Sequence, residues 1–184
     1  MFIQVEQTPN PETLKFLPGQ SVMQTGTAEF TDINEASESP LANRIFDLGG
    51  VDRVFYGQDF ISVTKTSERD WMLLKPRVLG AIMEHFTSES PLFTTDKTQD
   101  KDDYETEDDE LTKQIKELLD TRVRPAVAMD GGDIVFQKFD QGILYLKMQG
   151  ACAGCPSSTA TLKSGIENMM RHFIPEVEEV QAIE

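Results

Sequence analysis

The chain has 184 residues, of which 39% are hydrophobic and 27% charged, so its length and composition fit one globular domain or two small ones. Apolar runs such as residues 143–146 are far shorter than the roughly 20 residues needed to cross a bilayer, which excludes an integral membrane protein. Its 32 acidic and 17 basic residues give a net charge of −15, which argues against nucleic-acid binding, because phosphate contacts require a basic face.

The first elements are predicted to be strands. Residues 2–7 alternate between apolar and polar side chains, and a second extended segment, 13–17, follows the turn at 8–11. A short helix is predicted after Ser39, which suits a helix cap and precedes a proline. A hairpin is then expected from residues 51–56 and 60–65.

Residues 70–86 have helical periodicity, although Pro76 must either begin the regular part of the helix or kink it. Trp71, next to the cap residue Asp70, is expected to be a packing residue. His85, near the end of the helix, is expected at the surface, where its charge would suit the helix dipole. We find no catalytic constellation in this half of the chain and predict that the protein is not an enzyme.

An acidic segment divides the chain. Residues 96–110 contain 9 acidic and 2 basic residues, and Tyr104 is their only aromatic residue. Charge repulsion and the lack of side chains to bury predict a solvated spacer, although a tether that recruits iron or a basic partner is an alternative. We therefore predict two small α+β domains, 1–90 and 111–184, joined by an acidic flexible linker, 91–110.

The second domain is predicted to begin with an amphipathic helix from residue 111 that ends at Pro125. A hairpin of residues 134–139 and 143–148 follows, then a second amphipathic helix and a weak final strand at 177–183. The expected order is helix, hairpin, helix, strand.

The segment at 150–158, Gly-Ala-Cys-Ala-Gly-Cys-Pro-Ser-Ser, contains both cysteines of the chain. Pro156 suits the first position of a helix, which would place Cys155 at the cap and Cys152 in the preceding loop. The positive end of the helix dipole would then face both sulfur atoms and favour their thiolate forms. We expect an exposed and reactive site.

Four interpretations of this C-x-x-C compete. The cysteines could be structural, although an exposed intracellular loop does not favour a disulfide. They could form a dithiol redox site, but the hairpin that leads in, Ala151 before the pair and Pro156 after it are unlike a thioredoxin-type motif. Zinc or an iron-sulfur cluster could be held by four thiolates shared between two chains.

The number of available ligands favours sharing. A cluster requires four cysteine ligands, whereas one chain offers Cys152 and Cys155, with His85 and His172 as the only imidazoles. Two chains related by a twofold axis would supply four equivalent thiolates. A cluster held by short loops at an interface is easily released, which points to a carrier rather than to an enzyme.

Two motifs of the second domain, Asp-Gly-Gly-Asp at 130–133 and the cysteine segment at 150–158, closely resemble the C-terminal domain of NifU and the Nfu proteins. Four segments of the first domain resemble the N-terminal domain of the Nfu scaffold proteins of mitochondria and α-proteobacteria: residues 7–11, 14–16, 39–42 and 70–71. The resemblance therefore covers both domains.

The resemblance implies an iron-sulfur scaffold and carrier. A 4Fe-4S cluster, or alternatively a 2Fe-2S cluster, would bind between two protomers through the metal ligands Cys152 and Cys155 of each, and would pass to apo-proteins. Upstream assembly proteins would supply the cluster, the loaded form would be a homodimer, and the N-terminal domain would contact partners. The acids of residues 130–133 are not expected to be ligands.

The start of the sequence, residues 1–6, contains no basic region followed by an apolar stretch, and it lacks the Arg-rich character of a mitochondrial presequence. We therefore expect an intracellular protein of a bacterial cytoplasm. The mitochondrial matrix is the alternative if the sequence is that of a mature form.

Overall fold

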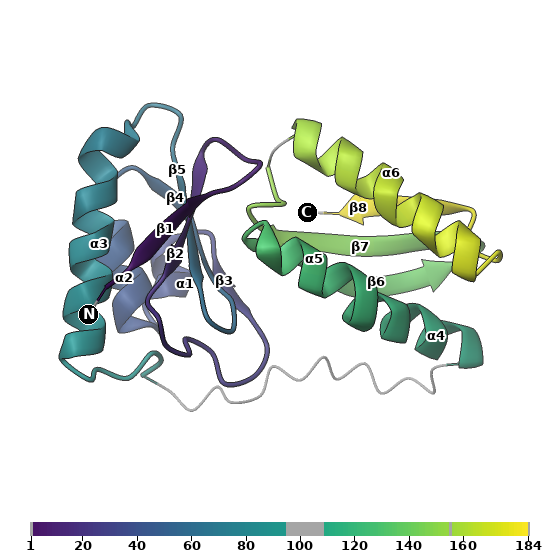
Figure 1. Ribbon diagram of the computed structural model, residues 1–184, viewed down its shortest axis with the longest axis horizontal. Helices are drawn as coiled ribbons and strands as arrows, with labels where there is room; N and C mark the ends of the chain where they lie inside the picture. Colours follow the sequence, from purple (N-terminus) through teal and green to yellow (C-terminus); the bar gives the residue numbers. More distant parts are fainter. Residues whose placement is uncertain (1, 95–108, 155, 184) are drawn as a thin grey trace. The chain divides into compact units, whose positions relative to one another are not determined.

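The computed structural model describes residues 2–94, 109–154 and 156–183, which fall into two compact units, Met1–Lys101 and Asp102–Glu184 (Figure 1). Each unit combines helices with one β-sheet, which confirms the predicted α+β class. Most of the acidic linker predicted at 91–110 lies outside the described residues. No helix in the described ranges is long and apolar enough to cross a membrane.

The first unit contains a five-stranded antiparallel sheet in the order β1-β2-β5-β4-β3. Its strands are β1 (Gln4–Gln7), β2 (Thr13–Leu17), β3 (Ala28–Phe30), β4 (Val51–Tyr56) and β5 (Ile61–Lys65). All four strands predicted for this half are present. Strand β3, which pairs with β4 and completes the sheet, was not predicted.

Three helices belong to this unit: α1 (Ile33–Ala36), α2 (Pro40–Asp47) and α3 (Trp71–Thr87). The predicted caps are confirmed, because Ser39 accepts a hydrogen bond from the Ala42 amide and Asp70 accepts one from the Met72 amide. Helices α2 and α3 pack on one face of the sheet, where their apolar residues form a single core with β2, β4 and β5 (Figure 1). Helix α3 is continuous through Pro76.

The predictions for the two notable side chains of α3 have different outcomes. Trp71 packs against the core, as expected, and its indole N–H donates to the Pro11 carbonyl at 3.3 Å. The surface position predicted for His85 is wrong, because this side chain is only 2% exposed. It lies four residues after Ala81 and three after Ile82, on the buried side of α3, and burial and the Arg44 charge lower the pKa of His85.

The packed part of the first unit reaches at least Thr94. Leu92 and Phe93 pack against its core, and the Phe93 ring lies 6.3 Å from the Phe30 ring and 6.2 Å from the Tyr56 ring. The Thr94 amide donates to the Glu38 carbonyl.

The second unit has a three-stranded sheet in the order β6-β7-β8, in which β6 (Gly132–Asp140) and β7 (Ile143–Gly150) are antiparallel and β8 (Glu179–Ile183) is parallel to β7. Its α-helices are α4 (Glu110–Leu118), α5 (Arg124–Met129) and α6 (Pro156–Phe173). Alternate residues of β7, including Leu144 and Leu146, face a core that both α4–α5 and α6 cover. The predicted hairpin, second helix and final strand are confirmed.

The predicted end of the first helix at Pro125 is wrong. A π-helical segment, η1 (Leu119–Val123), joins α4 to α5, and Pro125 lies within the first turn of α5. Proline lacks an amide hydrogen and crowds the carbonyl four residues earlier, so it normally stops an α-helix. The wider turn of η1 immediately before Pro125 accommodates it, and the chain continues to Met129.

Candidate functional site

Cys152 lies in the short loop that connects β7 to α6, one turn of chain before the helix begins. Gly150 and Gly154 bound this part of the loop with positive φ angles of 64° and 75°, which favour glycine. Cys155, the second predicted ligand, lies outside the described residues. The geometry of the cysteine pair and the predicted cap at Cys155 therefore stay predictions.

The motif at 130–133 lies against this loop, so the sheet brings together two segments that are distant in the sequence. Gly132 is paired with Gly150 in the β6–β7 register, and the Ala151 amide donates to the Gly131 carbonyl at 3.1 Å. On the helix side, the Thr159 hydroxyl of α6 donates to the Cys152 carbonyl at 3.1 Å. The backbone of the cysteine loop is thus tied to both neighbours.

Gly132 is in van der Waals contact with the Cys152 side chain. A Cβ atom at residue 132 would lie 2.6 Å from the Cys152 sulfur and 2.7 Å from the Gln149 carbonyl oxygen. Both distances are too short for real contacts, and the carbonyl belongs to the backbone of β7. Only glycine at position 132 allows the sulfur to occupy its present place.

The exposed position predicted for Cys152 is wrong, because the residue is 5% exposed and belongs to the apolar core of the second unit. Burial, with smaller contributions from the charges of Asp130 and Asp133, raises the pKa of the Cys152 thiol to about 12. The expectation that its surroundings favour the thiolate is therefore also wrong. The loss of hydration on burial is the largest cause of this shift.

Asp133, the last residue of the 130–133 motif, is buried and forms an ion pair with Arg124. Asp133 is 4% exposed, and its two carboxylate oxygens accept hydrogen bonds from Arg124 Nε at 2.9 Å and Arg124 Nη2 at 2.8 Å. Arg124 also donates to Asp120 at 3.1 Å, and the Asp133 hydrogen bond raises the pKa of the guanidinium. Because Asp133 is held by this bidentate contact, its role is to anchor the start of β6 beside the cysteine loop.

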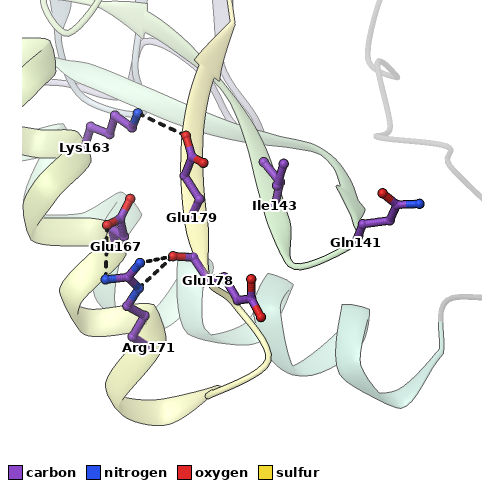
Figure 2. A pocket seen from close by; sticks show the side chains of 7 residues that line it. All are labelled: Gln141, Ile143, Lys163, Glu167, Arg171, Glu178 and Glu179. Carbon is purple, nitrogen blue, oxygen red and sulfur yellow. Dashed lines mark hydrogen bonds and ion pairs between the residues drawn. The ribbon is translucent and has the colours of Figure 1, made fainter.

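A polar pocket lies along the later turns of α6, away from the first turn that follows the cysteine loop (Figure 2). Arg171 donates to the Glu178 carbonyl at 2.7 Å, and Glu167 accepts the Val180 amide hydrogen at 3.1 Å. Lys163 is 3.8 Å from Glu179. These side chains satisfy one another and the backbone of β8. Among the described residues, no group of three His, Cys, Asp or Glu side chains could hold a metal ion.

The burial of Cys152 predicts a slow and steeply pH-dependent reaction with iodoacetamide. In a Cys155→Ser variant, we expect the alkylation rate of Cys152 at pH 8 to be about two to three orders of magnitude below that of the chain unfolded in guanidinium, rising about tenfold per pH unit up to pH 10. Folding raises the pKa of the Cys152 thiol, so the free energy of unfolding should not depend on this group below about pH 9. Above about pH 9 the free energy of unfolding should fall by about 1.4 kcal/mol per pH unit, because the unfolded chain loses this proton first. Mass spectrometry measures the rate. A plateau near pH 8 would show an accessible thiolate.

Two family models match the chain. The model described as "Scaffold protein Nfu/NifU N terminal" matches residues 3–89, and the model described as "NifU-like domain" matches residues 115–181. The first match falls in the first unit, and the second match includes the cysteine loop.

The relatives resemble the chain over its whole length. The Homo sapiens protein named "NFU1 iron-sulfur cluster scaffold homolog, mitochondrial" is 50% identical, over 100% of this chain and 72% of the relative. The Arabidopsis thaliana "NifU-like protein 4, mitochondrial" is 51% identical, over 98% of this chain and 65% of the relative. A solution NMR structure of a NifU-like protein from Saccharomyces cerevisiae is 26% identical, covering 52% of this chain and 86% of that one, with a TM-score of 0.45.

The location predicted from the sequence is contradicted by these relatives. The Homo sapiens, Arabidopsis thaliana and Drosophila willistoni relatives are named as mitochondrial proteins, so the expected bacterial cytoplasm is wrong. That expectation depended on the composition of the first residues, which informs on a compartment only where a targeting segment is part of the sequence.

Proposed function

Because the chain belongs to the Nfu family of iron-sulfur cluster scaffold proteins, we propose that it carries a 4Fe-4S cluster between two protomers and delivers it to apo-proteins. Cys152 and Cys155 of each protomer would be the four ligands. The observation that supports this most directly is the position of Cys152 in a short loop at the start of α6, within the segment that matches the NifU-like domain.

The donor chemistry suits this cargo, because thiolates are the usual ligands of iron-sulfur clusters. One chain contains two cysteines, so a four-thiolate set requires a second chain. In the structure the Cys152 sulfur lies against Gly132, and cluster binding therefore requires the loop to turn this side chain outward. Two hydrogen bonds, from Ala151 to Gly131 and from Thr159 to Cys152, hold the loop in its present form.

A dithiol redox protein is one alternative. The raised pKa of Cys152 does not separate it from a cluster carrier, because thiol exchange and metal binding both need the thiolate. Catalytic reduction of a protein disulfide without metal would favour this alternative. Zinc bound by four thiolates remains an alternative with the same ligands, and metal analysis distinguishes it from a cluster.

We propose that the two units have different roles. The second unit carries the cargo, and the first, whose sequence has no cysteine, contacts client and assembly proteins. We propose no catalytic activity for either unit.

The test is anaerobic reconstitution with iron and sulfide, followed by size exclusion and metal analysis. We expect a brown dimer with about two irons and two sulfides per chain, which is half of a four-thiolate cubane each. A dimer with about one iron and one sulfide per chain would indicate a 2Fe-2S cluster. A colourless monomer that binds zinc, or that cycles its thiols to a disulfide, would contradict the proposal.

Changing either ligand should abolish loading without unfolding the chain. In Cys152→Ala and Cys155→Ala we expect less than about a tenth of the wild-type iron, because two of the four shared thiolates are lost from the dimer. Met129→Ala is the matched control, since Met129 is a sulfur-containing residue of the same unit that is 76% exposed. Circular dichroism checks folding. A folded Cys152 variant that retains its full iron content would exclude Cys152 as a ligand.

A further inference from the structure

Helix α3 of the first unit presents an apolar surface to solvent. Met72 is 83% exposed, Leu73 71% and Met83 43%, and Pro76 and Gly80 between them are also exposed. Their spacing along the helix places these five residues on one side. We refer to Met72, Leu73, Pro76, Gly80 and Met83 as the α3 outer face.

The α3 outer face is not needed for packing within the first unit. The residues that α3 buries, including Leu74, Val78 and Ile82, lie on the opposite side of the helix. A surface helix normally places polar residues opposite its buried stripe, whereas α3 is apolar on both sides. Exposed apolar faces of this kind are characteristic of surfaces that another molecule covers.

Gly80, near the middle of the face, provides a second and independent observation. A Cβ atom added there would meet no atom within 4 Å, so the fold does not require glycine at this position for space. Glycine inside a helix is nonetheless about 1 kcal/mol less favourable than alanine. Because Gly80 has no side chain, the backbone of another helix can approach α3 closely at this position.

The charged residues beside the α3 outer face indicate what kind of partner would cover it. Arg69, Lys75 and Arg77 are exposed, and none of them forms an ion pair with another described residue. Within residues 2–94, the other basic residues each have a carboxylate partner within 4 Å: Lys15, Arg44, Arg53 and Lys65. In a chain of net charge −15, the cations of residues 2–94 that have no ion pair with a described residue thus lie just before α3 and in its first half. Of these, Arg77 also donates a hydrogen bond to the Leu48 carbonyl at 3.1 Å.

We propose that the α3 outer face is the docking site for an acidic amphipathic helix of a partner protein. The apolar side of that helix packs on Met72, Leu73 and Met83 and crosses α3 at Gly80. Acidic residues along its margins pair with Lys75 and Arg77. The site contains no cysteine, so it operates whether or not the second unit carries cargo.

Two other occupants are less compatible with these observations. An anionic membrane would be repelled by the overall charge of −15, although the local cations would attract it. A second copy of α3 would bring the same cations together. The experiment below distinguishes a membrane and a second copy of the chain from an acidic helix.

The experiment measures the anisotropy of a fluorescein-labelled peptide against the full chain. The probe is a synthetic 20-residue helical peptide with leucine along one side and glutamate at the margins, and its twin has lysine in place of glutamate. We expect saturable binding of the glutamate peptide and at least tenfold weaker binding of the lysine peptide. Trp71, the one tryptophan of the chain, lies in the first turn of α3, so its emission should change with the same midpoint.

Variants test whether the peptide binds at the α3 outer face. Leu73→Ser and Gly80→Gln should each weaken it at least tenfold, while Gly80→Gln should leave the thermal midpoint equal or higher because glutamine is a better helix former. Met129→Asp, at an exposed methionine of the second unit, and Cys152→Ala should bind the peptide as the wild type does. The Cys152 variant separates this result from the outcome of cluster reconstitution.

Four results would overturn the proposal. Equal binding of both peptides, or binding that Gly80→Gln leaves unchanged, would show that the face does not select an acidic helix. Stronger binding to phosphatidylglycerol vesicles than to neutral ones, lost in Leu73→Ser, would assign the face to a membrane. A dimer of the cluster-free chain that Gly80→Gln dissociates in sedimentation would assign it to a second copy.

Discussion

Arg124→Met is expected to lower the free energy of unfolding of the second unit by about 3 kcal/mol. The substitution keeps most of the side-chain volume but removes the two hydrogen bonds from Arg124 to Asp133, a carboxylate that is 4% exposed and would lose its charged partner. The value is at the lower end for a broken buried pair because the Arg124 side chain is 31% exposed. Urea denaturation followed by circular dichroism measures it.

Two further variants test the cause. Asp120→Asn removes the other contact of Arg124, at a carboxylate that is 61% exposed, and should change stability by less than about 0.5 kcal/mol. Asp133→Asn added to Arg124→Met should recover part of the loss, because a buried amide is less costly than a buried charge. If Arg124→Met were no more destabilising than Asp120→Asn, the pair would not anchor β6.

Gly132→Ala is expected to destabilise the second unit by about 2–3 kcal/mol and to displace Cys152. The new methyl group would lie 2.6 Å from the Cys152 sulfur and 2.7 Å from the Gln149 carbonyl oxygen, and the latter contact can be relieved only by moving the backbone of β7. The same displacement should make the Cys152 thiol at least tenfold more reactive toward iodoacetamide, because a more exposed sulfur loses less hydration.

Gly165→Ala is the matched control, since a Cβ atom at this position of α6 meets no atom within 4 Å. It should stabilise the unit by up to about 1 kcal/mol. In a Cys152→Ala background, Gly132→Ala should be less destabilising than in the wild type, because one of its two close contacts is gone. An equal loss in both backgrounds would mean that the sulfur does not lie against Gly132.

Local sequence signals predicted most of the fold. The caps at Ser39 and Asp70, the alternation of the strands and the turn residues between them depend on neighbours a few positions away, and they gave the α+β class and most of the elements. In the first unit, the elements that were not predicted, β3 and α1, have three and four residues, which is too short for a periodic signal.

The site was predicted less well, because its properties arise from contacts distant in the sequence. The segment around Cys152 indicates a loop before a helix, but its burial depends on Gly132 across the sheet. Arg124 was not connected with Asp133, although a buried acid at the start of a strand requires a partner. His85 lies seven residues after Val78, on the apolar stripe of α3, and this spacing was the signal that would have placed it in the core.

The contacts that Glu167 and Arg171 make with β8 also determine how this unit can meet other chains. Strand β8 is at the edge of the sheet, and the amide of Val180 already donates to the Glu167 side chain. The Glu178 carbonyl just before the strand accepts from Arg171 (Figure 2). An incoming strand would have to displace both side chains before it could pair there. The start of β8 is therefore protected against strand addition, and any association of two copies of the second unit would not extend their sheets at this point.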